Sequence, residues 1–133
     1  MYLRFVSPLR NRRRDLHMGI FQAAFRCRDQ DGIRIKLKQQ LISEIEWFKR
    51  HLPEPDLWCF NYLDVRGLHR DPVSWFKPSA TRMIKHAENL SRLVDEAGIP
   101  IRKLASDCPG EIVYEDDFQI VVHAFLHQKP KFR

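Results

Sequence analysis

Two stretches in the middle of the chain space their apolar residues as amphipathic helices do. The clearer one spans residues 80–97, where one stripe consists of Ala80, Met83, Ile84, Ala87, Leu90, Val94 and Ala97. Gly98 follows as a C-terminal stop, and either Ser74 or Ser79 can cap the start. The other stripe spans residues 37–52 and ends before Pro53, which cannot continue a helix. The pattern predicts a helix in each stretch.

A further helical stripe begins near Leu16, with Asp15 as its N-cap. The following residues, 25–37, fit two interpretations. Apolar and basic residues alternate on both sides of Asp31-Gly32, as in a β-hairpin, while the stripe from Leu37 onward favours two helices joined by a turn. We adopt the two helices, and the hairpin stays open as the alternative.

Alternating or β-branched segments at both ends of the chain predict strands. Residues 2–6 alternate and stop at Ser7-Pro8, and residues 99–104 form a second apolar segment. Residues 112–114 and 118–125 flank an acidic turn and predict a hairpin. The expected fold is α+β: one domain over residues 1–133, with a mostly antiparallel sheet of about four strands (the N-terminal strand plus three C-terminal ones) and three helices on one face.

The positive charge of the chain lies at its ends. The formal net charge is +6, of which residues 1–14 contribute +5 with no acid and residues 129–133 contribute +3, which leaves −2 for the remainder. We therefore expect a near-neutral domain with a basic loop at residues 7–14 and a basic tail at residues 127–133.

Length and composition place the chain among small globular proteins. A chain of 133 residues suits one domain, and 44% hydrophobic with 30% charged residues is typical of one. No apolar run approaches the roughly 20 residues that span a bilayer, so we expect a cytoplasmic protein without a membrane partner. In a reducing compartment the cysteines, odd in number and far apart, are expected to be inert thiols: Cys27, Cys59 and Cys108.

Four segments together resemble a family of short, uncharacterised bacterial proteins. They are Met1-Tyr2-Leu3-Arg4-Phe5-Val6, Gly19-Ile20-Phe21-Gln22-Ala23, Ser74-Trp75-Phe76-Lys77 and Pro109-Gly110-Glu111-Ile112-Val113-Tyr114-Glu115-Asp116-Asp117-Phe118-Gln119. The segments are spread over nearly the whole chain, so the resemblance concerns the whole domain. It implies a bacterial, single-domain, cytosolic protein, and it brings no activity, cofactor or catalytic residue.

The terminal basic residues are the leading candidates for a binding site. Arginine can contact phosphate through charge-assisted, bidentate hydrogen bonds, whereas the alternative interpretation of such a run is a solvated loop. If both ends leave the same side of the sheet, they form one cationic patch for nucleic acid or another polyanion. The residues are Arg10, Arg12, Arg13, Arg14, Lys129, Lys131 and Arg133.

Two Trp-Phe pairs, Trp47-Phe48 and Trp75-Phe76, are expected on helices. Adjacent side chains on a helix cannot both point inward, so one ring of each pair would lie near the rim. We interpret the pairs as core and rim packing between helices, and the alternative is that Trp47 and Trp75 are exposed anchors for a partner protein.

Metal, cofactor and catalytic patterns are weak in this sequence. No paired Cys or His spacing suits zinc, and His123 and His127 would lie about 13 Å apart on a strand. The acids Glu115-Asp116-Asp117 could hold Mg²⁺ but are also ordinary turn residues. We expect no metal and no cofactor.

Three functions remain, in this order. The first is a non-enzymatic binding module that contacts nucleic acid or another polyanion through its basic termini. The second is an accessory subunit of a larger bacterial complex, which would use an aromatic flank or a sheet edge as its contact. The third is an enzyme with a pocket near Arg66, His69 and Cys108, and no motif of catalytic spacing supports it.

Overall fold

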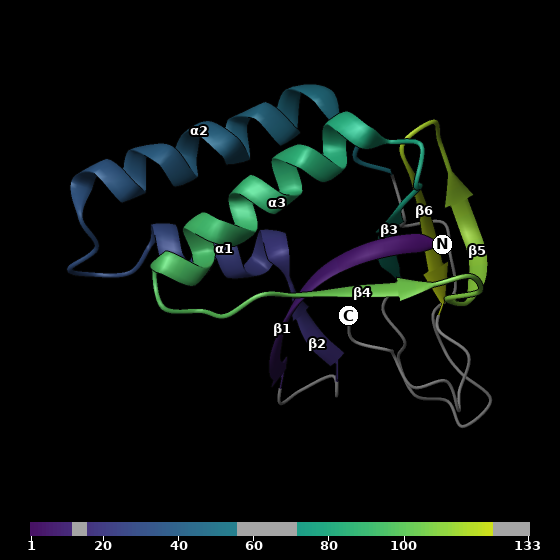
Figure 1. Cartoon of the computed structure of the whole chain (residues 1–133), viewed down its shortest axis with the longest axis horizontal. Helices are drawn as coiled ribbons and strands as arrows, with labels where there is room; N and C mark the ends of the chain where they lie inside the picture. The colour runs from purple at the N-terminus through teal and green to yellow at the C-terminus, as the bar shows by residue number, and fades with distance from the viewer. Residues whose placement is uncertain (12–15, 56–71, 124–133) are drawn as a thin grey trace.

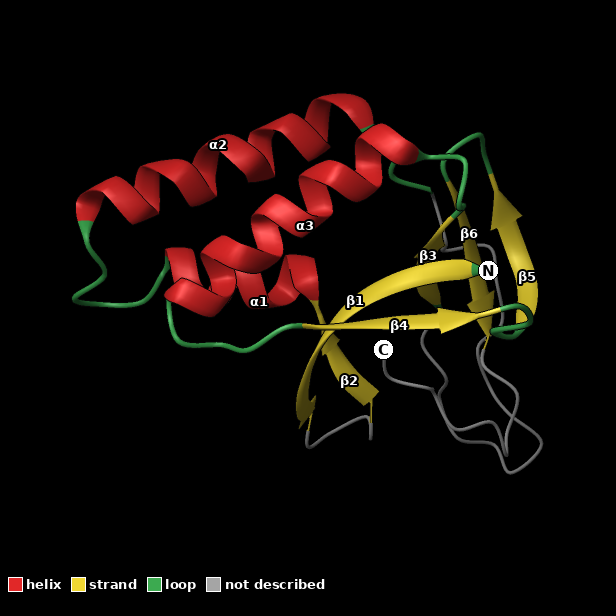
Figure 2. Ribbon diagram, in the orientation of Figure 1, coloured by secondary structure: helices red, strands yellow, loops and turns green. Residues whose placement is uncertain are grey.

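The computed structural model describes residues 1–11, 16–55 and 72–123, and these residues form three helices over one sheet (Figures 1 and 2). The elements in chain order are β1 (Tyr2–Asn11), β2 (Leu16–Gly19), α1 (Ile20–Arg28), α2 (Ile35–His51), β3 (Val73–Phe76), α3 (Thr81–Glu96), β4 (Arg102–Ser106), β5 (Glu111–Glu115) and β6 (Gln119–His123). The α+β class and the single layer of three helices agree with the sequence-based prediction.

Strand β1 organises the sheet because it pairs along both of its edges. Val6 pairs with Gly19 of β2 and with Arg102 of β4, so β2 and β4 lie on opposite edges of β1. Leu3 pairs with Phe76 of β3 and with Ala105 of β4, so β3 shares the edge occupied by β2. The order continues from β3 to β6 and β5, and every pairing among the described residues is antiparallel.

The sheet buries apolar side chains on both faces. On the helix side, side chains from all three helices pack with residues of the sheet such as Phe5 and Phe76. The other face carries a smaller cluster whose described members all lie on strands, and we call it the second core: Val6, Trp75, Leu104, Ile120 and Val122, with Tyr2 and Val73 packed against them. Neighbouring residues of one strand therefore enter different cores.

The prediction of about four strands is wrong, because the described residues alone form a sheet of six strands. The two missed strands are short. Residues 16–19 were expected to begin a helix, but they form β2, and the helix begins at Ile20. Residues 73–76 were expected to lie in or before the third helix, but they form β3, and α3 begins at Thr81. Four-residue apolar segments carry too little periodicity to separate a strand from a helical turn.

Pro8 does not end the first strand, which continues to Asn11. The register between β1 and β2 shifts between Val6 and Arg10, so Ser7 and Pro8 lie at a bulge-like irregularity. A bulge is one of the few places where a strand accepts proline, because the missing N–H is not needed for the ladder there. Of the predicted basic loop at residues 7–14, residues 7–11 are therefore strand, and residues 12–14 lie outside the described part.

The helical interpretation of the middle of the chain is confirmed. α1 ends at Arg28 and α2 begins at Ile35, which excludes the hairpin about Asp31-Gly32. Gly32 and Gly98 follow α1 and α3 with φ of 81° and 109°, a left-handed conformation that glycine adopts without strain. The predicted C-terminal hairpin is also confirmed, as β5 and β6.

Candidate functional site

The arginine cluster belongs to a β-hairpin. Arg10 of β1 pairs with His17 of β2, and Asn11 pairs with Leu16. Residues 12–15 therefore connect two paired strands, and we call residues 10–17 the basic hairpin tip. The paired ends of β1 and β2 lie at the opposite side of the molecule from α2 (Figure 1). Sequence analysis identified these arginines but placed them in a loop after a finished strand.

The remaining predicted polyanion-binding residues are not tested by the structure. Arg12, Arg13 and Arg14 lie outside the described residues, and so do Lys129, Lys131 and Arg133. Whether the two basic ends of the chain share one surface therefore stays a prediction. Only Arg10 is placed, by its backbone pairing in β1.

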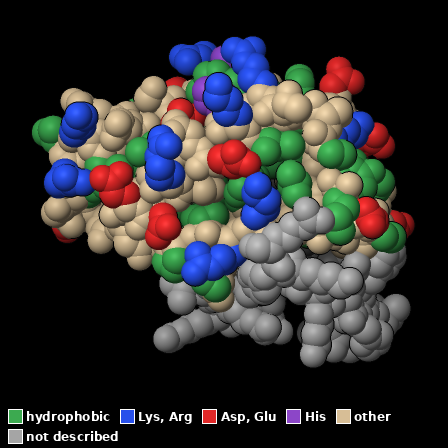
Figure 3. Space-filling view, viewed as in Figure 1, with side chains coloured by type: hydrophobic (Ala, Val, Ile, Leu, Met, Phe, Trp, Pro, Cys, Tyr) green, Lys and Arg blue, Asp and Glu red, His purple; other side chains and the backbone are tan. Residues whose placement is uncertain are grey.

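The charges on the described body are mixed. On the face in Figure 3, lysine and arginine side chains alternate with aspartate and glutamate. Several are engaged in exposed ion pairs, such as Arg34 with Glu96 and Lys103 with Glu88. Arg102, which pairs with Val6 beside the hairpin, is exposed and forms no ion pair with a described carboxylate. Arg102 therefore adds an exposed positive side chain at the start of β4, on the strand that pairs with β1.

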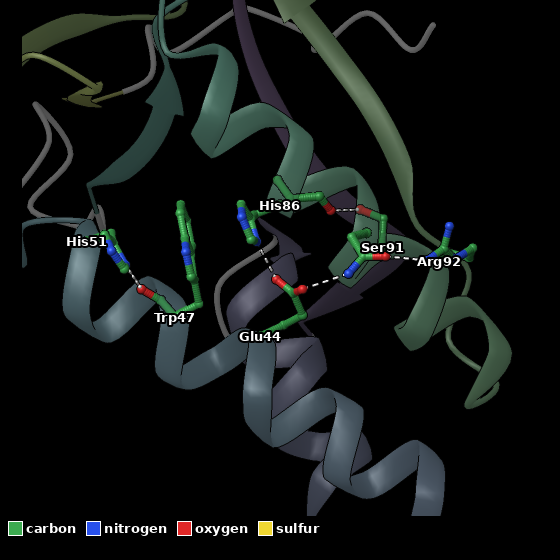
Figure 4. Close-up of polar contacts among 8 residues, drawn as sticks. Glu44, Trp47, His51, His86, Ser91 and Arg92 are labelled. Atoms are coloured by element: carbon green, nitrogen blue, oxygen red, sulfur yellow. Dashed lines mark hydrogen bonds and ion pairs between the residues drawn. The ribbon is translucent and has the colours of Figure 1, made fainter.

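Trp47 of α2 lies between the rings of His51 and His86 (Figure 4). Its ring centroid is 4.5 Å from that of His51 and 3.5 Å from that of His86, and both pairs are stacked. The guanidinium of Arg82 lies 5.4 Å from the ring centroid of Trp47. Because side chains of the same chain stack on both of its faces, this ring has little face left for stacking on a base or on a partner residue.

A hydrogen-bonded carboxylate fixes the orientation of His86. Its Nδ1 donates to Glu44 Oε2 at 2.9 Å, and Asn89 donates to the other oxygen of Glu44 at 2.6 Å (Figure 4). Arg92 in turn donates to the amide oxygen of Asn89. These contacts tie α2 to α3, so we assign the group a structural role. Phe48 is buried beside Trp47, as the prediction of core and rim packing requires.

Trp75 is not an exposed anchor, because only 6% of it is accessible. It lies on strand β3, where successive side chains project to opposite faces. Phe76 therefore enters the helix-side core, and Trp75 enters the second core. We expected one ring of the Trp75-Phe76 pair to lie near the rim. This prediction is wrong because it assumed a helix, whereas the pair lies on a strand.

The acidic turn between β5 and β6 uses its carboxylates internally. Asp116 accepts hydrogen bonds from the backbone N–H groups of Phe118 and Gln119, from the Tyr114 hydroxyl and from the Gln119 amide. Burial by itself would raise the pKa of Asp116, but these four hydrogen bonds outweigh it and lower that pKa. Glu115 forms an ion pair with Lys77. The turn interpretation therefore accounts for two of the three acids.

The pocket considered for an enzyme is largely outside the described residues, which include neither Arg66 nor His69. Cys108 is exposed, and Cys27 is buried with its pKa raised by burial. His127 lies outside as well, so the His123 and His127 pair is not tested. Within residues 1–11, 16–55 and 72–123, no group of three or more His, Cys, Asp or Glu side chains could hold a metal ion.

Arg4 is a candidate binding residue that was not identified from the sequence. Arg4 lies between Tyr2 and Val6 on the alternating strand β1, and both of these neighbours pack in the second core. Burial lowers the pKa of the Arg4 guanidinium to about 10. The signal was present in the sequence, because an arginine shares a strand face with a tyrosine and a valine at positions i−2 and i+2.

Comparison with family models, curated proteins and solved structures finds no match to this chain. Among the described residues, no helix combines the length and hydropathy needed to cross a membrane. The residues and their arrangement are therefore the only basis for a function.

Proposed function

We propose that this chain is a small nucleic-acid-binding module whose main contact element is the basic hairpin tip. The observation that carries the proposal is the pairing of Arg10 with His17 and of Asn11 with Leu16. It makes the arginine-rich segment the connection of a two-stranded antiparallel ribbon. Such ribbons are one of the two elements that fit the major groove of duplex DNA.

The charge distribution supports the same proposal. Residues 1–14 contain five arginines and no acid, whereas residues 15–128 sum to −2. Positive charge concentrated in one short segment of the chain favours phosphate contacts, because each neutralised phosphate releases condensed counterions. Lys129, Lys131 and Arg133 enter the proposal as a second basic segment that contacts the same ligand.

The salt dependence of binding tests the role of the arginines. A labelled DNA duplex is titrated with the wild type and with the Arg12→Ala, Arg13→Ala, Arg14→Ala variant at several salt concentrations, and fluorescence anisotropy reports binding. The slope of log K against log salt should fall by about 0.9 for each phosphate that the variant no longer neutralises. The matched control removes three exposed lysines of α2 and α3, Lys36→Ala, Lys38→Ala and Lys85→Ala, and should keep the wild-type slope.

Two results would count against this function. If both triple variants reduce the slope equally, net charge and not the hairpin drives binding. If heparin at equal charge competes as well as unlabelled duplex, the ligand is any polyanion and nucleic acid is not preferred. A third variant, Lys129→Ala, Lys131→Ala, Arg133→Ala, tests the contribution of the tail in the same assay.

One observation favours a second function, that of a protein-interaction subunit. Strand β5 is an edge of the sheet among the described strands, and its Ile112 is 46% exposed. An edge strand can pair with a strand of a partner, although the register shift at Ile112 and Tyr114 hinders such pairing. Size-exclusion chromatography with light scattering tests this: an oligomer that Ile112→Lys converts to a monomer would support the second function.

A further inference from the structure

We propose that the face of the sheet opposite α1, α2 and α3 holds a site for a small oxyanion, a phosphate or a carboxylate group, bound by the guanidinium of Arg4 and the indole N–H of Trp75. The site is separate from the basic hairpin tip and does not depend on nucleic-acid binding. It lies in the second core, where strands β1 and β3 meet.

The register places the two donors beside each other. Leu3 pairs with Phe76 in the antiparallel β1–β3 pairing, so the next positions along the two strands are Arg4 and Trp75. Trp75 belongs to the second core, and so do Tyr2 and Val6, the neighbours of Arg4 on the same face of β1. Side chains at such facing positions project from the same side of a sheet.

Both donors lack an acceptor among the described residues. The Nε1 atom of Trp75 is buried and has no hydrogen-bond partner there. Arg4 is partly buried, and no described carboxylate lies within ion-pair distance of it. The pKa of Arg4 is lowered by burial, and no described acid opposes that shift. Buried donors without acceptors are costly, and an arginine keeps its charge under ordinary conditions.

Gly19 leaves room for the guanidinium. A Cβ atom at this position would lie 3.3 Å from Nη2 of Arg4, which is closer than such contacts usually are. The φ of Gly19 is −70°, which any residue can adopt, so its backbone conformation does not require glycine. A side chain at position 19 would therefore crowd the guanidinium of Arg4 and require it to shift slightly.

The chemistry of the two groups indicates the ligand. A guanidinium presents a planar fork that matches two oxygens of a carboxylate or a phosphate, and an indole adds a single donor. The surrounding side chains, Leu104 and Ile120, are fully buried and apolar. An apolar environment strengthens such charged hydrogen bonds relative to water. A guanidinium and an indole N–H at neighbouring positions, with no described carboxylate in ion-pair contact with the guanidinium, therefore favour a small oxyanion.

Thermal unfolding tests the site. The melting temperature is measured in sodium chloride and, at the same ionic strength, in sodium phosphate and in sodium acetate, for the wild type, Arg4→Met and Arg102→Met. Arg102 is an exposed arginine on the neighbouring strand and serves as the control. The wild type and Arg102→Met should melt higher in at least one of the two oxyanions, because a ligand that binds only the folded state stabilises it. Arg4→Met should show no such rise.

The stability of Arg4→Met in the absence of oxyanion is a second readout. In chloride, Arg4→Met should be at least as stable as the wild type, because replacing a poorly compensated buried charge by an apolar group is often neutral or stabilising. A rise in phosphate alone assigns a phosphate ligand, and a rise in acetate alone assigns a carboxylate. A wild type that responds to neither, or an Arg4→Met protein that responds as the wild type does, overturns the proposal.

A spectroscopic titration decides the question even if Arg4→Met fails to fold. The indole N–H resonances of the ¹⁵N-labelled wild type are followed as phosphate or acetate is added, with Trp75→Phe and Trp47→Phe used to assign two of them. The Trp75 resonance should shift as its N–H gains an acceptor, and the Trp47 resonance should stay in place. A stationary Trp75 resonance up to high millimolar oxyanion would overturn the proposal.

Discussion

The hairpins at the two ends of the sheet are built alike but use their charges differently. The β5–β6 hairpin turns through Glu115, Asp116 and Asp117, and most of this charge is satisfied by its own surroundings. The β1–β2 hairpin connects through Arg12, Arg13 and Arg14, and the first fourteen residues contain no acid. The β5–β6 turn is acidic, and the carboxylates of Glu115 and Asp116 form ion pairs or hydrogen bonds with nearby residues. The segment that joins β1 to β2 carries an excess of positive charge.

We infer from this difference that the acidic charge has a structural role, and we propose a binding role for the basic charge. A carboxylate that accepts four hydrogen bonds stabilises the turn that holds it, and it has little capacity left for a ligand. Like charges that are close in sequence repel one another, so the excess positive charge of residues 1–14 is not explained by local stabilisation. We therefore expect substitutions in the acidic turn to change stability, and substitutions in the basic hairpin tip to change binding.

The largest expected effect on stability follows from removing the carboxylate of the acidic turn. Asp116→Ala should lower the free energy of unfolding by about 2 kcal/mol, because four donors are left without a charged acceptor. Urea unfolding measures the effect. The control Asp117→Ala, an exposed neighbour, should change it by less than about 0.5 kcal/mol. If both variants lose the same free energy of unfolding, the hydrogen bonds of Asp116 do not stabilise the acidic turn, and the proposed difference between the two hairpins is wrong.

A smaller effect is expected from pH. The pKa of Asp116 is lower in the folded protein than in the unfolded chain, where an aspartate titrates near about 3.9. Its stabilisation is therefore complete above that value and is lost as pH falls through the lower, folded-state pKa. The stability difference between the wild type and Asp116→Asn, measured by urea unfolding, should shrink as the pH is lowered below about 4. A constant difference would mean that the carboxylate charge is not what holds the turn.

Long periodic segments were predictable from the sequence, and short ones were not. The stripe at residues 80–97 identified α3, and the apolar segments around Glu115-Asp116-Asp117 identified the β5–β6 hairpin. Strand β3 was missed because its adjacent Trp75 and Phe76 are both buried. A sheet covered on both faces accepts a continuous apolar run, so the alternation that marks a strand is absent there.

The candidate sites show the same limit. Composition alone found the arginines of residues 10–14, because charge counting needs no structure. Their place on a paired ribbon depends on β2, which the sequence did not reveal. The pairing of Arg4 with Trp75 as neighbouring donors depends on contact between strands about 70 residues apart in sequence. No local pattern encodes such a contact.

The proposed function requires that the basic hairpin tip contacts nucleic acid. An NMR titration of the ¹⁵N-labelled protein with a short DNA duplex tests it most directly, because each backbone amide reports separately. We expect the largest shift changes at Arg10, Asn11 and His17, with the amides of Glu115 and Asp116 unchanged. Changes centred on strand β5, or none at the β1–β2 hairpin while DNA binds, would contradict it.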